Sequence, residues 1–239
     1  MDLKEEDILG DKIGSHWYYV SKGRALTRFL GTLKTKVLLD VGAGSGIFSR
    51  QLLDQGIAER AVCVDPNYAE EKTETHNGKE ISFVRQDKNG YNLVLMMDVL
   101  EHVPDDVALL KEYGDQMPKG GHVLITVPAF QFLWSGHDVF LEHYRRYTAQ
   151  MVDDMVQAAG LEVVKTRYFF GLLFPLVCAI RFVKTRLLNQ GKMEAHSELK
   201  VYPDAVNSAL IAAHDIERWT IFDFNKVAGL SVFCLCRKP

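Results

Sequence analysis

The chain has 239 residues, 47% of them apolar, which is enough for one large domain or two small domains with a substantial core. Its formal net charge of -3 gives no sign of a nucleic-acid partner at the level of the whole chain. The first twelve residues are acidic and lack an apolar segment, so we expect no secretory signal there.

Short apolar, β-branched segments that end in turn residues predict seven strands. They are residues 36–42, 61–66, 81–87, 91–98, 122–130, 161–170 and 229–239. Segments with helical spacing lie between them at 49–56, 104–117 and 148–160, with Asp105 and Thr148 as expected N-caps. This alternation predicts a single α/β domain with a mostly parallel sheet, helices on both faces and a final strand that returns late.

Three glycines at alternate positions follow the first predicted strand, in the sequence VLLDVGAGSGIFSR (37–50). Glycines let the backbone turn sharply and approach a ligand closely, and the next helix offers free N–H groups at its start. A phosphate-binding P-loop is excluded because no Gly-Lys-Ser/Thr follows. The dinucleotide pattern G-x-G-x-x-G also fails, since the third glycine comes one residue early. What remains is D-x-G-x-G-x-G.

That pattern resembles the first motif of the class I S-adenosylmethionine-dependent methyltransferases, and three later motifs agree with it. The second strand ends in Asp65, "FVRQD" supplies Asp87, and "YNLVLMMDVLEHV" resembles the fourth strand and its exit. The resemblance covers about residues 36–130 and implies a Rossmann-like seven-stranded sheet with an antiparallel last strand. It implies S-adenosyl-L-methionine as cofactor and S-adenosyl-L-homocysteine as product. The implied cofactor-binding residues are Asp40, Gly42, Ala43, Gly44, Gly46, Asp65, Pro66, Asp87, Met97 and Asp98.

Two further segments, "HWYYVSKGRAL" near the N-terminus and "VPAFQFLWSGHDVFLEHYRRYT" after the fifth strand, resemble one bacterial branch of these enzymes. In the family such segments close over the cofactor and shape the acceptor pocket. The resemblance therefore implies an N-terminal lid containing Trp17, Tyr18 and Tyr19. It also implies an acceptor side with Trp134, Tyr144 and Arg145, and a small-molecule or lipid-linked sugar acceptor. Arg145 and Arg146 could instead tie the loop to the domain.

A hydroxyl acceptor gains from a general base, and histidine is the usual residue near neutral pH. The candidates are His137 beside Asp138, then His143, then His102. One acid and two histidines in "HDVFLEH" make a weak metal signal, so we expect no metal site. His102 could simply hydrogen-bond to backbone at a helix start.

Residues 171–229, between the sixth and seventh strands, form the main departure from a minimal methyltransferase. The uncharged segment Tyr168–Ile180 is shorter than the about 20 residues that a membrane-spanning helix needs. Apolar residues at helical spacing and nearby basic residues over 168–188 favour either an interfacial helix that contacts the membrane, or a helix packed on this domain or on a second subunit of a homodimer. A second helix from Pro203, capped by Asp204, suggests a helical hairpin covering the pocket.

The resulting organisation is a lid at 1–35, a cofactor-binding core at 36–170, the helical insertion at 171–229 and a last core strand at 230–239. The four cysteines form no C-x-x-C pair, so we expect reduced, buried thiols and a cytoplasmic protein, peripheral to the inner membrane face if the insertion contacts lipid. The function we expect is methyl transfer to a small-molecule or lipid-linked acceptor. The alternatives are a non-catalytic protein that binds the cofactor or its product, and a nicotinamide-dependent oxidoreductase.

Overall fold

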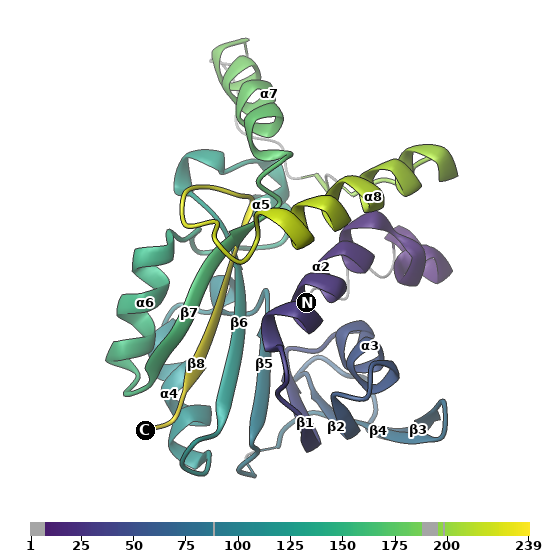
Figure 1. Cartoon of the computed structure of the whole chain (residues 1–239), viewed down its shortest axis with the longest axis vertical. Coiled ribbons are helices and arrows are strands. Elements are labelled where there is room, and N and C mark those ends of the chain that lie inside the picture. The colour runs from purple at the N-terminus through teal and green to yellow at the C-terminus, as the bar shows by residue number, and fades with distance from the viewer. Residues whose placement is uncertain (1–7, 88, 188–195, 198) are drawn as a thin grey trace.

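The computed structural model describes residues 8–87, 89–187, 196, 197 and 199–239, and it shows one mixed sheet with helices on both faces (Figure 1). The strand order is β3-β4-β2-β1-β5-β6-β8-β7. The strands are β1 (Thr35–Val41), β2 (Ala58–Val64), β3 (Lys72–His76), β4 (Lys79–Val84), β5 (Leu93–Met97), β6 (His122–Pro128), β7 (Glu162–Phe169) and β8 (Ser231–Arg237).

The predicted α/β architecture is confirmed, with one strand more than the seven expected. Strands β4, β2, β1, β5 and β6 pair in parallel, whereas β8 runs antiparallel to both β6 and β7. The additional strand β3 is polar (KTETH) and pairs antiparallel with β4 at the edge of the sheet. An edge strand with no buried face carries no apolar alternation, which is why its sequence gave no strand signal.

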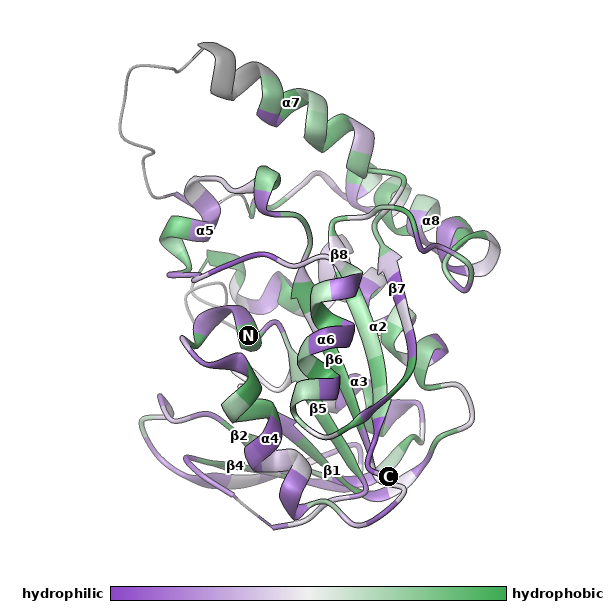
Figure 2. Ribbon diagram, turned by 90° about the vertical axis from the view of Figure 1, so that its left-hand side faces the viewer, coloured by the Kyte–Doolittle hydropathy of each residue, from purple (hydrophilic) through white to green (hydrophobic). Residues whose placement is uncertain are grey.

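Two hydrophobic clusters lie on opposite faces of the sheet. On one face α2 (Trp17–Leu30) and α3 (Ile47–Asp54) pack with aromatic residues such as Phe169 and Phe222. On the other face lie α4 (Asp106–Gln116) and α6 (Ala149–Ala158). Figure 2 shows β5 and β6 as hydrophobic strands between these layers, as expected for parallel strands buried on both faces. Cys63, Cys234 and Cys236 are free and buried, as predicted, whereas Cys178 is free but only half-buried.

Short helical segments complete the carboxyl end of the sheet. They are η1 (Gly10–Ser15), η2 (Leu100–His102), η3 (Gln131–Leu133) and α5 (Gly136–Phe140). Both predicted N-caps are confirmed, since Asp105 accepts from the N–H of Ala108 at 2.9 Å and Thr148 accepts from the N–H of Met151 at 3.2 Å.

The insertion forms two helices, α7 (Phe174–Leu187) and α8 (Asp204–Thr220), but they do not pair as the predicted hairpin. Figure 1 shows α7 projecting away from the sheet while α8 lies beside α2. Asn207 of α8 accepts from the N–H of Trp17 at 2.8 Å, and Asp215 pairs with Arg24 at 2.5 Å. The second half of the insertion therefore covers the N-terminal helix. Helix α8 begins at Asp204, so Pro203 rather than Asp204 occupies the cap position.

Residues 188–195 and 198 of the insertion, and residues 1–7 of the expected lid, lie outside the described residues. Within the part that is described, no helix is long and apolar enough to cross a bilayer.

Candidate functional site

The glycine turn after β1 needs glycine for steric reasons. Gly42 has φ +66°, and a Cβ there would lie 2.7 Å from Cγ2 of Val99. Gly46 has φ +70° at the N-cap of α3, and its Cβ would lie 2.9 Å from the ring of Phe83. Gly44 also has positive φ. Both the left-handed backbone and the close neighbours exclude larger residues, so this turn presents bare backbone at the carboxyl end of β1.

Asp65 lies directly after β2 and faces the same turn. One carboxylate oxygen accepts from the N–H of Gly44 at 3.3 Å, and the other accepts from the N–H of Asn67 at 2.9 Å. Pro66 is exposed beside it. Asp65 thus fixes the turn at Pro66 and still holds its carboxylate against the glycine turn. The resemblance implies that both positions bind the cofactor, and the structure brings them together.

Asp87 lies three residues beyond β4. Its carboxylate accepts from the hydroxyl of Tyr91 and from the N–H of Asn89, both at 2.8 Å. It is half-buried at the carboxyl edge of the sheet, where the sequence resemblance places an adenine-binding acid.

Asp40, near the end of β1, is buried. The hydroxyl of Ser49 on α3 donates to its carboxylate at 2.8 Å, which ties the end of β1 to the start of that helix. Burial raises the pKa of Asp40 to about 6, although the hydrogen bond from Ser49 acts in the opposite direction. Asp40 therefore stabilises the glycine turn through its bond to Ser49. Ala43, next to Gly42, is also buried.

Asp98 follows β5 and forms a buried ion pair that the sequence did not reveal. Its carboxylate accepts from Nζ of Lys22, a fully buried lysine on α2, and from the hydroxyl of Tyr18 at 3.2 Å. Thr126 of β6 donates to it at 3.1 Å, and Met97 is buried just before it. Burial alone would raise the pKa of Asp98, but the Lys22 ammonium lowers it below the ordinary value.

These groups suit S-adenosylmethionine better than a pyrophosphate cofactor. Three acids (Asp65, Asp87 and Asp98) lie at the carboxyl ends of successive parallel strands, around a turn whose glycines leave room for close approach. Carboxylates accept hydrogen bonds from ribose hydroxyls and attract ammonium and sulfonium charge, whereas they repel phosphates. The residues present therefore fit the cofactor.

Of the predicted lid residues, Tyr18 alone reaches the charged pair. Trp17 stacks on His214 of α8 at 5.5 Å and meets Phe170 edge-on at 5.7 Å. Tyr19 is fully buried in the core against Phe48, so it supports the helix rather than forming an exposed lid. The helix itself lies over the carboxyl end of β5, as a lid would.

On the acceptor side, both arginines are tied to the domain. Arg145 donates to Asp106 at 2.8 Å and to the carbonyl of Pro104 at 2.6 Å. Arg146 is buried and forms a two-pronged pair with Asp138 at 2.6 and 3.0 Å. Tyr144 is exposed, while its N–H donates to the carbonyl of Glu101 at 2.7 Å. Trp134 is half-buried at the end of η3. The loop after β6 is therefore anchored to the exit of β5.

The carboxylate of Asp138 contacts His143, five residues further along the chain. Its carboxylate accepts from Nδ1 of His143 at 2.9 Å, in addition to its pair with Arg146. Burial would raise the pKa of Asp138, but the bonds from His143 and Arg146 hold it well below the usual range. His137 is half-buried on α5. His102 on η2 meets His143 edge-on, with ring centroids 4.7 Å apart.

Glu101, between Leu100 and His102, is a site residue that sequence reasoning did not single out. Its side chain is completely buried, and burial followed by the nearby Asp98 carboxylate raises its pKa well above that of an ordinary carboxyl. Ligating atoms of Glu101, His102 and His143 lie within 4.8 Å of one another. The expectation of no metal site treated "HDVFLEH" in isolation, and two of these three residues come from elsewhere.

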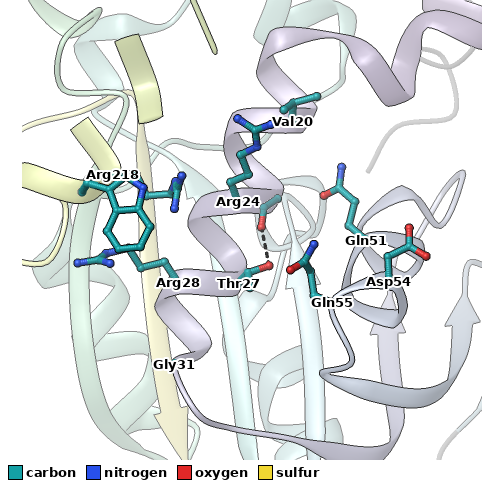
Figure 3. Close-up of a pocket in the computed structure, with 11 residues that line it drawn as sticks. Val20, Arg24, Thr27, Arg28, Gly31, Gln51, Asp54, Gln55 and Arg218 are labelled. Atoms are coloured by element: carbon teal, nitrogen blue, oxygen red, sulfur yellow. Dashed lines mark hydrogen bonds between the residues drawn. The ribbon is translucent and has the colours of Figure 1, made fainter. Parts of the chain in front are cut away.

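One cavity lies away from this edge, and a second reaches it from the side. One, of about 630 Å³, lies between α2, α3 and α8; Figure 3 shows Gln51, Asp54 and Gln55 across from Arg28 and Arg218. Its arginines are paired with acids, Arg24 with Asp215 and Arg28 with Asp223. The other, of about 550 Å³, reaches Gly44 and Ser45 from the side of β3. The acids and the glycine turn lie at the carboxyl ends of the strands, whereas the larger of these two cavities does not reach them.

The raised pKa of Asp40 predicts a pH-dependent cost in stability. Because the folded state holds the proton up to about pH 6 and an unfolded aspartate loses it near 3.8, this group's contribution to stability falls as pH rises between these values. Asp40→Asn cannot titrate. Relative to this variant, the wild type should lose about 2 kcal/mol between about pH 4.5 and pH 7, measured by urea unfolding. A difference that stays constant with pH would contradict this.

Removing one member of the Lys22–Asp98 pair should leave a buried charge unpaired. Lys22→Met and Asp98→Asn should each lower the free energy of unfolding by about 3 to 5 kcal/mol, while the double variant should lose less than the sum. Arg60→Met, which breaks the exposed pair between Arg60 and Glu80, is the matched control and should cost about 1 kcal/mol or less. Additive single losses would show that the pair is not coupled.

Comparisons with known proteins agree with this geometry. The family described as "Methyltransferase domain" matches residues 16–166. A ubiquinone biosynthesis O-methyltransferase of Coxiella burnetii is 30% identical over 104 residues, which cover 40% of this chain and 44% of that protein. The chain thus matches less than half the length of that relative.

Solved structures show the same fold at low identity. An S-adenosylmethionine-dependent methyltransferase from Archaeoglobus fulgidus superposes with a TM-score of 0.55 and 15% identity, over 99% of this chain and 98% of that one. A complex of the Haloferax volcanii Trm112 activator with a methyltransferase gives a TM-score of 0.56 and 16% identity, over 95% and 92%. The family match spans well over half of the sequence and includes the glycine turn and the acids, so the chain belongs to the S-adenosylmethionine-dependent methyltransferases.

Proposed function

We propose that the protein transfers the methyl group of S-adenosylmethionine to a hydroxyl oxygen of a small-molecule or lipid-linked acceptor. Binding of the cofactor is supported by the position of Asp65 against the glycine turn, with Asp87 and Asp98 at the neighbouring strand ends. Bound there, the cofactor supplies an electrophilic methyl group on a sulfonium. The task of the chain is to hold the acceptor oxygen in line with it, since positioning provides much of the rate.

An oxygen acceptor is supported by two observations. The Coxiella burnetii relative is named an O-methyltransferase. In addition, Glu101, His102 and His143 form a cluster beside Asp98, between the exit of β5 and the loop after β6. Polar side chains at this position can accept the proton of an acceptor hydroxyl. Among the three histidines considered as bases, His143 has the best support, because Asp138 fixes its ring through Nδ1.

A lipid-linked acceptor is supported by the apolar surface around α7. Phe132, Leu172, Leu176 and Ile180 are exposed, and Figure 1 shows α7 extending from the carboxyl end of the sheet, the end that carries the site. The side chains of 183–187 lie outside the described residues. A helix with exposed apolar residues beside a site can lie at a bilayer surface and present lipid-linked substrates to it. On this proposal the protein is peripheral to the membrane.

Asp65→Ala should remove a cofactor contact without unfolding the sheet. We expect S-adenosylhomocysteine, titrated calorimetrically, to bind the wild type and to bind the variant at least about tenfold more weakly, as for loss of a charge-assisted hydrogen bond. Asp115→Ala, an exposed acid on α4, is the control and should bind like the wild type. Transfer of a labelled methyl group to a cell extract then separates an enzyme from a protein that only binds the cofactor. Failure of the wild type to bind S-adenosylhomocysteine would overturn the proposal.

Membrane contact should depend on the apolar face of α7. In flotation with anionic lipid vesicles, Leu176→Glu/Ile180→Glu should reduce the bound fraction of protein by about tenfold or more, because each side chain no longer transfers to the interface. Met151→Glu, an equally exposed apolar position on α6, is the control and should leave binding unchanged. A dimer that the α7 variant dissociates, with no vesicle binding by the wild type, would assign this surface to a second subunit instead.

A further inference from the structure

Three potential metal ligands from separate parts of the chain meet beside the site. Glu101 and His102 lie on η2 after β5, whereas His143 lies in the loop after α5. One ligating atom of each lies within 4.8 Å of the other two, close enough for a single ion to contact all three. A carboxylate and two imidazoles form a mixed oxygen and nitrogen donor set.

Glu101 provides an independent sign that a ligand belongs there. Its side chain is 0% exposed, and neither carboxylate oxygen has a hydrogen-bond partner among the residues that the structure describes. A buried carboxylate without hydrogen bonds is costly, and buried acids normally pair with donors or coordinate metals. Lys22, a buried ammonium in this region, makes its hydrogen bonds to Asp98 and Tyr18. Glu101 therefore retains two acceptor oxygens inside the protein.

His143 is oriented in the way that metal-binding histidines are. Asp138 accepts from its Nδ1 at 2.9 Å and is itself held by the guanidinium of Arg146. With Nδ1 carrying the proton, the lone pair is on Nε2. A carboxylate behind the ring, on the far nitrogen, is the usual arrangement that fixes the tautomer and orientation of a ligating histidine.

We propose that Glu101, His102 and His143 bind one divalent transition-metal cation. Two imidazoles and one carboxylate favour ions such as Mn²⁺, Fe²⁺, Co²⁺ or Zn²⁺ over Ca²⁺ and Mg²⁺, which prefer all-oxygen sites. Three protein ligands leave coordination positions open for water or for an oxygen of a second molecule. Asp138 acts as a positioning residue for His143.

The cation has a defined role if the proposed function is correct, and this part rests on it. The cluster lies next to Asp98, at the cofactor end of β5, so an acceptor hydroxyl on the open positions would face the methyl donor. In the metal-bound state the Nε2 lone pair of His143 is a ligand, so His143 is not the base there. Coordination instead lowers the pKa of a bound hydroxyl, whose proton leaves to solvent. The oxygen then forms the new bond to the methyl carbon, and the carbon–sulfur bond breaks with its electron pair remaining on sulfur. The metal stays divalent throughout.

Metal binding can be tested without activity. The full-length protein is treated with a chelator, dialysed and titrated with Co²⁺, with stoichiometry measured by elemental analysis and coordination followed by visible absorption. The wild type should bind about one Co²⁺ per chain. Glu101→Gln and His143→Gln should each weaken binding by more than about tenfold, and Asp138→Asn by about 10- to 100-fold. His122→Gln, at the opposite end of β6, removes an imidazole outside the cluster and should bind like the wild type.

The Co²⁺ titrations distinguish a bound cation from a cluster that binds none. No stoichiometric Co²⁺ binding by the wild type, or binding that both ligand variants retain, overturns the proposal. If Glu101→Gln does not fold, His143→Gln gives the same test at a more accessible position, with folding checked by thermal melting. S-adenosylhomocysteine titration distinguishes the two proposals, because loss of metal binding should leave cofactor binding within about threefold, whereas failure of the wild type to bind S-adenosylhomocysteine overturns the proposed function alone.

Discussion

The buried pair between Lys22 and Asp98 is the interaction on which the arrangement of the site depends. The ammonium of Lys22 is fully buried and the carboxylate of Asp98 is partly buried, so each needs the other, and the pair fixes α2 over the carboxyl end of β5. Tyr18 and Thr126 add hydrogen bonds to the same carboxylate from the helix and from β6. Asp98 also has a positive φ of 54°, a conformation that these contacts maintain. The N-terminal helix is thus part of the site rather than an appendage to the sheet.

Even with Asp98 paired to Lys22, carboxylates outnumber the cations that pair with them at the strand ends. Asp40, Asp65, Asp98 and Glu101 are buried or half-buried around one edge of the sheet, and Lys22 is the buried cation among them. Burial raises the pKa of both Asp40 and Glu101, and the neighbouring carboxylates of Asp65 and Asp98 raise them further. Ligands with positive charge relieve this repulsion. On the two proposals above, a sulfonium cofactor beside Asp65 and Asp98 and a metal cation at Glu101 would each offset part of this negative charge.

The sequence predicted the features that depend on local pattern. Apolar strands, the capping residues Asp105 and Thr148, and the glycine turn all follow from residues close together in the chain. Strand β3 was missed because its polar residues bury no face. The predicted hairpin of the insertion was wrong because α8 finds its partner in α2, almost two hundred positions earlier, through contacts such as Asn207 with Trp17. Helical spacing identifies an apolar face, but it does not identify the surface that covers it.

The same distinction separates the two halves of the site. Cofactor residues are set by short motifs at successive strand ends, so Asp65 and Gly44 could be paired before the fold was known. Acceptor-side residues come together only in three dimensions: Glu101 and His143 are far apart in the chain, and the adjacent histidine, His137, was the more obvious partner for Asp138. Arg145, which the resemblance placed on the acceptor side, pairs with Asp106, and Arg146 pairs with Asp138. Both arginines hold the loop that carries His143 against the rest of the domain. The position of the His143 imidazole therefore depends on contacts with residues distant in the sequence, such as Asp106.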